Sequence, residues 1–152
     1  HTGDRGVIED GQLKITGRVK ELFKTSKGKY VAPSPIENAL LLHPDIEQAC
    51  VSGASMPQPF GMVVLSDQAR EAVRDAERRA AVEASLREHM ETMNGGLDQH
   101  ENLEKIVVIG EPWTIENGLL TPTMKLKRSN IEGKYAERVD GWYKEKQPII
   151  WV

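Results

Sequence analysis

Two groups of cations are the residues in this chain with the clearest chemical potential. One group lies near the N-terminus and the other in the last third of the chain. They comprise Lys20, Lys24, Lys27 and Lys29, and then Lys125, Lys127 and Arg128. A cation that is held against a reacting phosphate or carboxylate stabilises the negative charge that develops there. Both basic segments are therefore candidates for binding and activating an anionic substrate.

Other common site types are missing from the sequence. It has neither the His-Glu-x-x-His nor the Cys-x-x-Cys spacing of a zinc site, and its four histidines are scattered. The pair Gly95-Gly96 lacks the strand-to-helix setting and the Lys-Ser/Thr ending of a phosphate-binding loop. We therefore expect no metal site and no nucleophile triad.

Composition narrows the class of protein. The chain has 152 residues and a formal net charge of -3, with 39% hydrophobic and 28% charged residues. These values are typical of one globular domain and argue against a disordered tail or a nucleic-acid-binding protein. The lone Cys50 has no internal disulfide partner, and neither a signal peptide nor an apolar run of about 20 residues occurs. A reducing, cytoplasmic setting is expected.

The N-terminal third predicts two hairpins and a helix. Asp10-Gly11 between short apolar runs indicates a hairpin at 6–16. A second, strongly basic hairpin is expected at 17–31, around Lys-Gly-Lys, and a helix begins near Pro33. Because the chain starts at His1 and enters a hairpin at once, we expect it to be part of a longer protein.

The remainder predicts helices that alternate with short strands. The apolar spacing over 68–94 is helical but slips in phase near Arg78, which indicates one bent helix or two successive ones. Another helix is expected at 128–145, after an irregular stretch at 111–124. Strands are expected at 46–51, 62–65 and 106–109. The fold class is therefore α+β, a small domain with β-hairpins and a mostly antiparallel sheet flanked by helices.

Three segments in order give a family resemblance. His1-Thr2-Gly3-Asp4, the stretch 15–21 and the stretch 117–128 resemble the signature blocks of the adenylate-forming superfamily, which includes acyl-CoA synthetases, firefly luciferase and peptide adenylation domains. The form of the second and third blocks is similar to the long-chain fatty acyl branch. The resemblance implies that 1–16 ends the large N-terminal domain and carries the hinge-proximal hairpin, and that 17–152 is the small C-terminal domain, or lid.

The resemblance also implies a role for five residues. Asp4 would hold the ribose hydroxyls of ATP, and Arg18 would approach the same nucleotide. Lys20 would be the hinge on which the lid turns. Gly28 would border the tunnel for the pantetheine arm of CoA, and Lys125 would be the catalytic lysine.

The assignment of the lysine depends on an alignment. Lys125-Leu126-Lys127-Arg128 matches the family ending S-G-K-I-x-R, which favours Lys125 over Lys127. Met124 stands where many relatives have Gly, a departure that fits the long-chain form and loosens the match.

The function implied is that of an AMP-forming long-chain fatty acid-CoA ligase. ATP, Mg²⁺ and CoA would serve the whole enzyme, with none bound tightly by this piece, which would be inactive alone. The partners would be the N-terminal ATP-binding domain and the substrates fatty acid and CoA, with room for peripheral membrane contact and no role for nucleic acid. Two alternatives remain: a ligase that delivers to a carrier protein, and a non-catalytic binding or adaptor module.

Each assignment has a plainer competitor. Lys125 and Lys20 would also suit a solvated surface, and Arg18 a surface ion pair. Asp4 would equally cap a turn, and Gly28 would equally supply a positive φ in a tight turn. The basic hairpin also fits a nucleic-acid patch, against which the net charge argues, and the helical stretch 68–94 also fits a solvated face.

Overall fold

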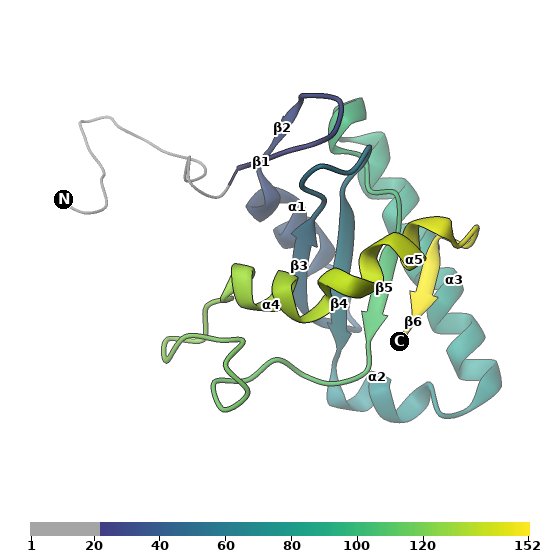
Figure 1. The fold of residues 1–152 in the computed structure, drawn as a ribbon. Helices are drawn as coiled ribbons and strands as arrows, with labels where there is room; N and C mark the ends of the chain where they lie inside the picture. The colour runs from purple at the N-terminus through teal and green to yellow at the C-terminus, as the bar shows by residue number, and fades with distance from the viewer. Residues whose placement is uncertain (1–21) are drawn as a thin grey trace, which may run out of the picture.

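The computed structural model describes residues 22–152, and Figure 1 shows their arrangement. The predicted hairpin at 6–16 lies outside the described residues, as do Asp4, Arg18 and Lys20. Among the described helices, none is long and apolar enough to cross a membrane.

A four-stranded mixed sheet forms the centre of the fold. Its strand order is β3-β4-β5-β6. The strands are β3 (Ile46–Ser52), β4 (Phe60–Leu65), β5 (Ile106–Ile109) and β6 (Ile149–Trp151). The α+β class and three of these strands were predicted, whereas β6 was missed because it has only three residues at the end of the chain.

Strand direction corrects one detail of the prediction. β3 and β4 pair antiparallel, but β4 with β5 and β5 with β6 pair parallel, so a mostly antiparallel sheet is wrong for this part of the molecule. The reason lies in the connections. A short loop joins β3 to β4, whereas helices fill the connections from β4 to β5 and from β5 to β6, and such crossovers allow parallel pairing.

The other predicted elements are present. β1 (Phe23–Lys24) and β2 (Tyr30–Val31) form the second hairpin as an antiparallel pair. The stretch 68–94 is two helices, because Asp75 caps a new one by accepting a hydrogen bond from the Arg78 amide at 3.0 Å. The helices and 3-10 turns are α1 (Pro33–Leu40), α2 (Asp67–Ala72), α3 (Ala76–Gly95), η2 (Gln99–Glu101), α4 (Arg128–Tyr135), η3 (Ala136–Arg138) and α5 (Val139–Lys144).

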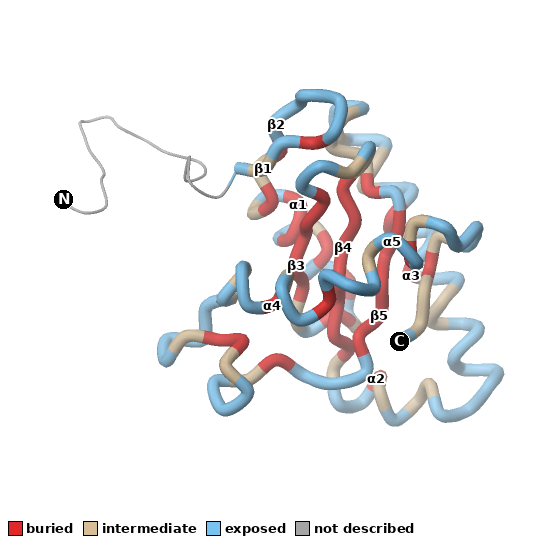
Figure 2. Tube along the Cα trace, in the orientation of Figure 1, coloured by how far each residue is buried: buried red, intermediate tan, exposed pale blue. Residues whose placement is uncertain are grey.

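The sheet is buried on both faces, so the fold has three layers (Figure 2). Successive residues of a strand point to opposite faces, and Val63 and Val108 accordingly pack with α1 and α3, whereas Met62 and Val107 pack with α4 and α5. All six residues of β4 are buried, which explains why its sequence is continuously apolar. The two core layers fix α1 and α4 on opposite sides of the sheet.

A pair of histidines joins the end of α1 to α3. His43 is buried, and its Nδ1 accepts a hydrogen bond from the Asp45 amide at 3.0 Å. Its Nε2 lies 2.8 Å from Ser85 Oγ, and His89 Nε2 donates to the Ala39 carbonyl at 2.9 Å. Burial lowers the pKa of His43, Asp45 opposes that shift, and His89 adds to it. The fold therefore holds His43 in its neutral form.

Acid should weaken this junction. Because the folded-state pKa of His43 lies below the ordinary 6.5, the unfolded chain binds the proton more tightly. The stabilising contribution is complete above pH 6.5 and decreases as the pH falls from there toward the folded-state pKa. Urea unfolding across this range should show a falling free energy of unfolding. His43→Asn, whose amide oxygen can still accept from Asp45, should flatten that dependence, and an unchanged slope would contradict the assignment.

Candidate active site

Lys125 lies on a short two-stranded ribbon that we call the lysine loop, residues 119–127. The Lys127 amide donates to the Leu119 carbonyl at 2.9 Å, and the Thr121 amide donates to the Lys125 carbonyl at 2.8 Å. Leu120 and Leu126 form an antiparallel bridge between these contacts. The loop is therefore held by backbone pairing, although the sequence predicted only an irregular stretch there.

The tip of the loop is a tight turn immediately before Lys125. The Met124 amide donates to the Thr121 carbonyl at 2.8 Å, and the Lys125 amide donates to Thr121 Oγ1 at 3.0 Å. Met124 has a φ of 67°, in the left-handed region that favours glycine. The turn therefore requires a conformation that glycine adopts freely and that Met124 adopts at a cost.

Both candidate lysines are exposed. Lys125 comes directly after the turn at the tip of the loop, whereas Lys127 lies at the base of the ribbon, directly before α4. Lys125 is thus the lysine at the outer end of the loop. An ammonium at the tip can reach a substrate bound outside this domain without moving the sheet.

On its N-terminal side, the lysine loop is tied to β3 through Trp113. The Gln48 side chain accepts from the Trp113 amide at 2.9 Å and donates to the Trp113 carbonyl at 2.8 Å. The Trp113 ring is buried and its Nε1 donates to the Tyr135 hydroxyl at 3.4 Å. Leu119 and Leu120, also buried, continue this anchor into the loop itself.

On its C-terminal side, the loop ends in a buried ion pair. Arg128 forms a two-pronged contact with the Glu37 carboxylate of α1, Nη1 meeting Oε2 and Nη2 donating to Oε1 at 3.1 Å. The same carboxylate accepts the Val51 amide of β3 at 2.8 Å, and Arg128 Nη1 lies 3.4 Å from the Val51 carbonyl. The side chains of Glu37 and Arg128 are only 9% and 20% exposed.

Cys50 lies under this ion pair. Arg128 Nη1 is 3.6 Å from its sulfur, and the residue is fully buried. Burial and, to a smaller extent, the negative charge of Glu37 raise the pKa of the Cys50 thiol to about 12. The thiol is therefore neutral and unreactive in the folded protein.

These anchors were not recognised in the sequence. Glu37 nevertheless leaves a signal, because it stands on the apolar side of its helix, between Pro33 and Leu40 in helical spacing. A glutamate in such a position is almost never fully buried without a partner. Gln48, inside a β-strand, carries no comparable signal.

Gly28 occupies the turn of the β1–β2 hairpin. Its φ is +82°, its amide donates to the Thr25 carbonyl at 3.0 Å, and a Cβ added there would have open space around it. The hairpin is docked onto the loop after β3 by two backbone contacts, Ser26 to Met56 and Ser55 to Lys24, each 2.9 Å.

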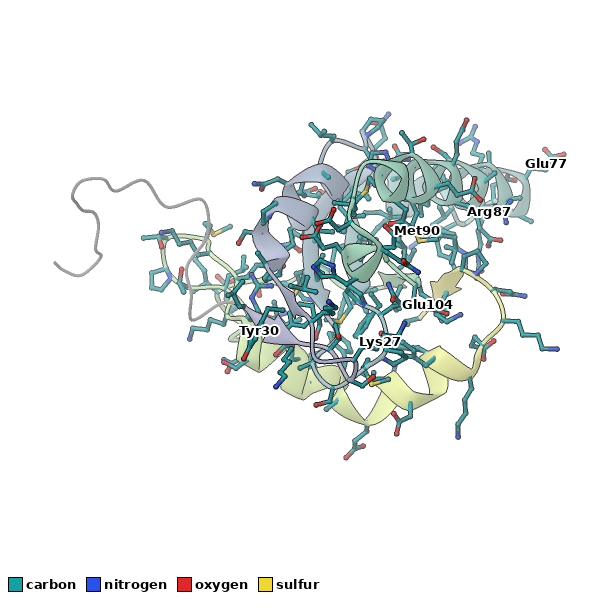
Figure 3. The ribbon with its side chains drawn as sticks, turned by 90° about the horizontal axis from the view of Figure 1, so that it is seen from above. Lys27, Tyr30, Glu77, Arg87, Met90 and Glu104 are labelled. Atoms are coloured by element: carbon teal, nitrogen blue, oxygen red, sulfur yellow. The ribbon has the colours of Figure 1, made fainter. Side chains whose placement is uncertain are left out.

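The hairpin also presents exposed cations. Lys24, Lys27 and Lys29 are all exposed, and Lys24 Nζ lies 5.8 Å from the centre of the Tyr30 ring. Lys27 and Tyr30 are labelled in Figure 3. In Figure 1 this hairpin and the lysine loop lie at different ends of the domain, so the structure does not bring Gly28 and Lys125 together.

One group of potential metal ligands occurs among the described residues. Asp98, His100 and Glu101 have ligand atoms within 4.8 Å of one another. Asp98 and Glu101 form the capping box of η2, and all three lie on a partly or fully exposed turn. Their arrangement is accounted for by capping of that turn.

Comparison with known protein families places the chain. Residues 21–147 match the AMP-binding enzyme C-terminal domain. The chain belongs to this family. The AMP-binding enzyme C-terminal domain described here is 34% identical over 160 residues to long chain acyl-CoA synthetase 6, peroxisomal, of Arabidopsis thaliana, with 95% of this chain and 23% of that protein covered.

A bacterial relative gives a similar match. Long-chain-fatty-acid-CoA ligase FadD15 of Mycobacterium tuberculosis is 32% identical over 158 residues, covering 95% of this chain and 26% of that protein. The chain thus spans about a quarter of the length of these relatives. The expectation of a cytoplasmic setting stays a prediction, and one of the relatives is named as peroxisomal.

Two adenylation domains are among the solved structures that resemble this fold. The adenylation domain of the carboxylate reductase from Mycobacterium chelonae matches with a TM-score of 0.73 and 30% identity, over 85% of this chain and 20% of that one. The A-PCP didomain of carboxylic acid reductase from Segniliparus rugosus, in complex with AMP, gives 0.67 and 30%, over 84% and 18%. The predicted lid fold is confirmed.

The positive φ at Met124 predicts how its variants behave. Met124→Gly should leave the free energy of unfolding unchanged or raise it by up to about 1 kcal/mol, because glycine adopts this conformation without a steric cost. Met124→Val should lower it by about 1 kcal/mol, since a branched Cβ is strongly disfavoured there. Denaturant unfolding of the two variants measures this. The reverse order of stability would mean that the turn has another conformation.

Proposed function

We propose that this domain is the lid of an AMP-forming long-chain fatty acid-CoA ligase, and that Lys125 acts in the adenylation step. Two long-chain acyl-CoA ligases among the relatives support the substrate class. The main observation in support of the role of Lys125 is the lysine loop, which presents an exposed Lys125 at its tip. Trp113 and Arg128 hold its two ends against the sheet.

The chemistry requires a cation at the moment of reaction. A carboxylate oxygen of the fatty acid attacks the α-phosphorus of ATP, the bond from that phosphorus to the bridging oxygen breaks, and pyrophosphate leaves. Negative charge accumulates on the phosphate oxygens during this exchange. The Lys125 ammonium, brought to those oxygens by the lid, stabilises that charge. Because the backbone of the lysine loop is already ordered by its pairing, only the side chain of Lys125 has to be fixed when it reaches them.

The remaining assignments belong to the same proposal. Asp4 and Arg18 would hold the nucleotide, Lys20 would be the hinge, and Mg²⁺ would accompany ATP in the N-terminal domain. After adenylation, the lid would turn about this hinge and present the hairpin of Gly28 to CoA. The thiol sulfur of CoA then attacks the acyl carbon and AMP leaves. The exposed lysines of the hairpin suit the phosphate groups of CoA.

A carrier-protein acceptor is the second candidate. Its support is the likeness to carboxylate reductase adenylation domains, one of them in an A-PCP didomain, at 30% identity. In that case the same Gly28 hairpin would meet a carrier-bound thiol in place of free CoA. Incubating the acyl-AMP form of the whole enzyme with CoA and recording thioester yield would distinguish the two.

Replacing Lys125 should separate the two half-reactions. In the full-length enzyme, with palmitate, ATP and Mg²⁺, Lys125→Ala should reduce pyrophosphate release about 100- to 1,000-fold, because it removes one preorganised cation from the transition state. Thioester formation from supplied acyl-AMP should be largely retained. Lys127→Ala is the matched control and should release pyrophosphate at nearly the parent rate. Equal release by parent and Lys125→Ala would move the role to Lys127.

Gly28→Leu should have the opposite selectivity. A leucine in this turn both strains a φ of +82° and projects a side chain into the space through which the thiol arm would pass. Thioester formation from acyl-AMP and CoA should fall while pyrophosphate release is retained. Gly28→Asn serves as the control, because asparagine tolerates this conformation with a smaller side chain. A normal thioester rate in Gly28→Leu would remove the tunnel assignment.

A further inference from the structure

The Glu37–Arg128 ion pair joins three elements at one point. Glu37 comes from α1, Arg128 is the first residue of α4, and both contact Val51 in β3. α1 and α4 lie on opposite faces of the sheet (Figure 1). Because β3 is an edge strand, the side chains of the pair reach from one layer to the other around it. No other described ion pair links elements in this way, since the rest lie on exposed surfaces.

Arg128 also stands directly at the end of the lysine loop. It follows Lys127, whose amide closes the base of the ribbon on Leu119. Within the first turn of α4, the Asn130 side chain donates to the Gly118 carbonyl at 2.8 Å. The position of the first turn of α4 therefore sets the position of both strands of the loop, and Arg128 fixes that first turn against the sheet.

The geometry of the pair suits orientation better than stability. Replacing a buried ion pair with apolar residues is often neutral or stabilising, because desolvation offsets most of the attraction. A two-pronged guanidinium–carboxylate contact, however, fixes distance and direction at once. The Val51 amide fixes the carboxylate in turn, so neither partner turns independently of β3.

We propose that Glu37 is a positioning residue for Lys125, acting through Arg128. It sets the direction in which the lysine loop leaves the sheet, and so the place that the Lys125 ammonium reaches when the lid closes for adenylation. This inference rests on the proposed role of Lys125 in that step. Gln48, which holds Trp113 on the same strand, fixes the other end of the segment, so β3 serves as the common reference for both ends.

The test is Glu37→Gln in the full-length enzyme. Glutamine keeps the shape and can still accept from Val51, but it loses the charge and one acceptor for Arg128. With palmitate, ATP and Mg²⁺, kcat for pyrophosphate release should fall about 100-fold, because a displacement of about 1 Å costs this much. KM for ATP and palmitate should stay within about twofold, as should thioester formation from supplied acyl-AMP.

Two controls separate positioning from stability. Glu71→Gln breaks the exposed pair of Glu71 and Arg74 on the side of α2 and should leave both half-reactions unchanged. Glu37→Gln introduced into Lys125→Ala should cause no further loss in the residual pyrophosphate release, since the two residues act in series. Should Glu37→Gln fail to fold, Arg128→Lys keeps the charge, loses the two-pronged contact and carries the same expectations.

The outcomes are distinguishable. Equal loss of both half-reactions in Glu37→Gln, or a further loss in the Lys125→Ala background, would make the pair purely structural and overturn the inference. Loss of adenylation in Lys125→Ala with a normal rate in Glu37→Gln would overturn the inference alone. Normal adenylation by Lys125→Ala would overturn the proposed role of Lys125, on which this inference rests, and move that role to Lys127. Where only Arg128→Lys folds, its normal adenylation rate would also overturn the inference.

Discussion

The contact of the Glu37 carboxylate with the Arg128 guanidinium is the constraint on which the site depends. The sheet alone does not determine where the lysine loop leaves it, because the loop connects β5 to α4 over the surface. The ion pair fixes where the loop leaves the sheet, because it holds the start of α4 against α1 and the backbone of β3. Ile131 and Tyr135 pack α4 against the sheet, and Glu132 adds a second directional contact to β3 by accepting from the Ser52 hydroxyl at 2.8 Å.

The same domain thus carries two separate candidate surfaces, the hairpin of Gly28 and the lysine loop. The hairpin of Gly28 leads through Val31 directly into α1, and Glu37 lies in that helix. The hairpin and the lysine loop are in this way connected through α1 and the ion pair. A rotation of the whole domain would exchange one surface for the other at a fixed active site, without internal rearrangement.

The sequence predicted those elements that depend on interactions between residues close together in the chain. Helical spacing and turn residues predicted the basic hairpin, α1, one bent or two successive helices over 68–94, and a helix over 128–145. Strand direction was not accessible, because it depends on which way a crossover connection returns, and that is decided by packing on both faces of the sheet. β6 was not predicted, because a strand of three residues is too short to show a periodic pattern.

The site divides in the same way. Lys125 and Gly28 were proposed from motif resemblance, whereas the turn at Met124 was not predicted, because that segment was expected to be irregular. The residues that hold the loop did not emerge, because Glu37 and Arg128 are 91 positions apart and meet only in the folded chain. A charged residue on an apolar helix face was the available clue. Gln48 gave none, since its side chain pairs with the Trp113 backbone in the manner of a neighbouring strand.

The buried Cys50 has a practical consequence. It is the single cysteine of the chain, contacts Arg128, and lies in the core layer that also holds Ile131 of α4 and Trp142 of α5. A thiol reagent can reach it only when this core layer opens locally. The rate at which a thiol reagent labels Cys50 therefore measures how often this part of the core opens. No cysteine has to be engineered into the chain for that measurement.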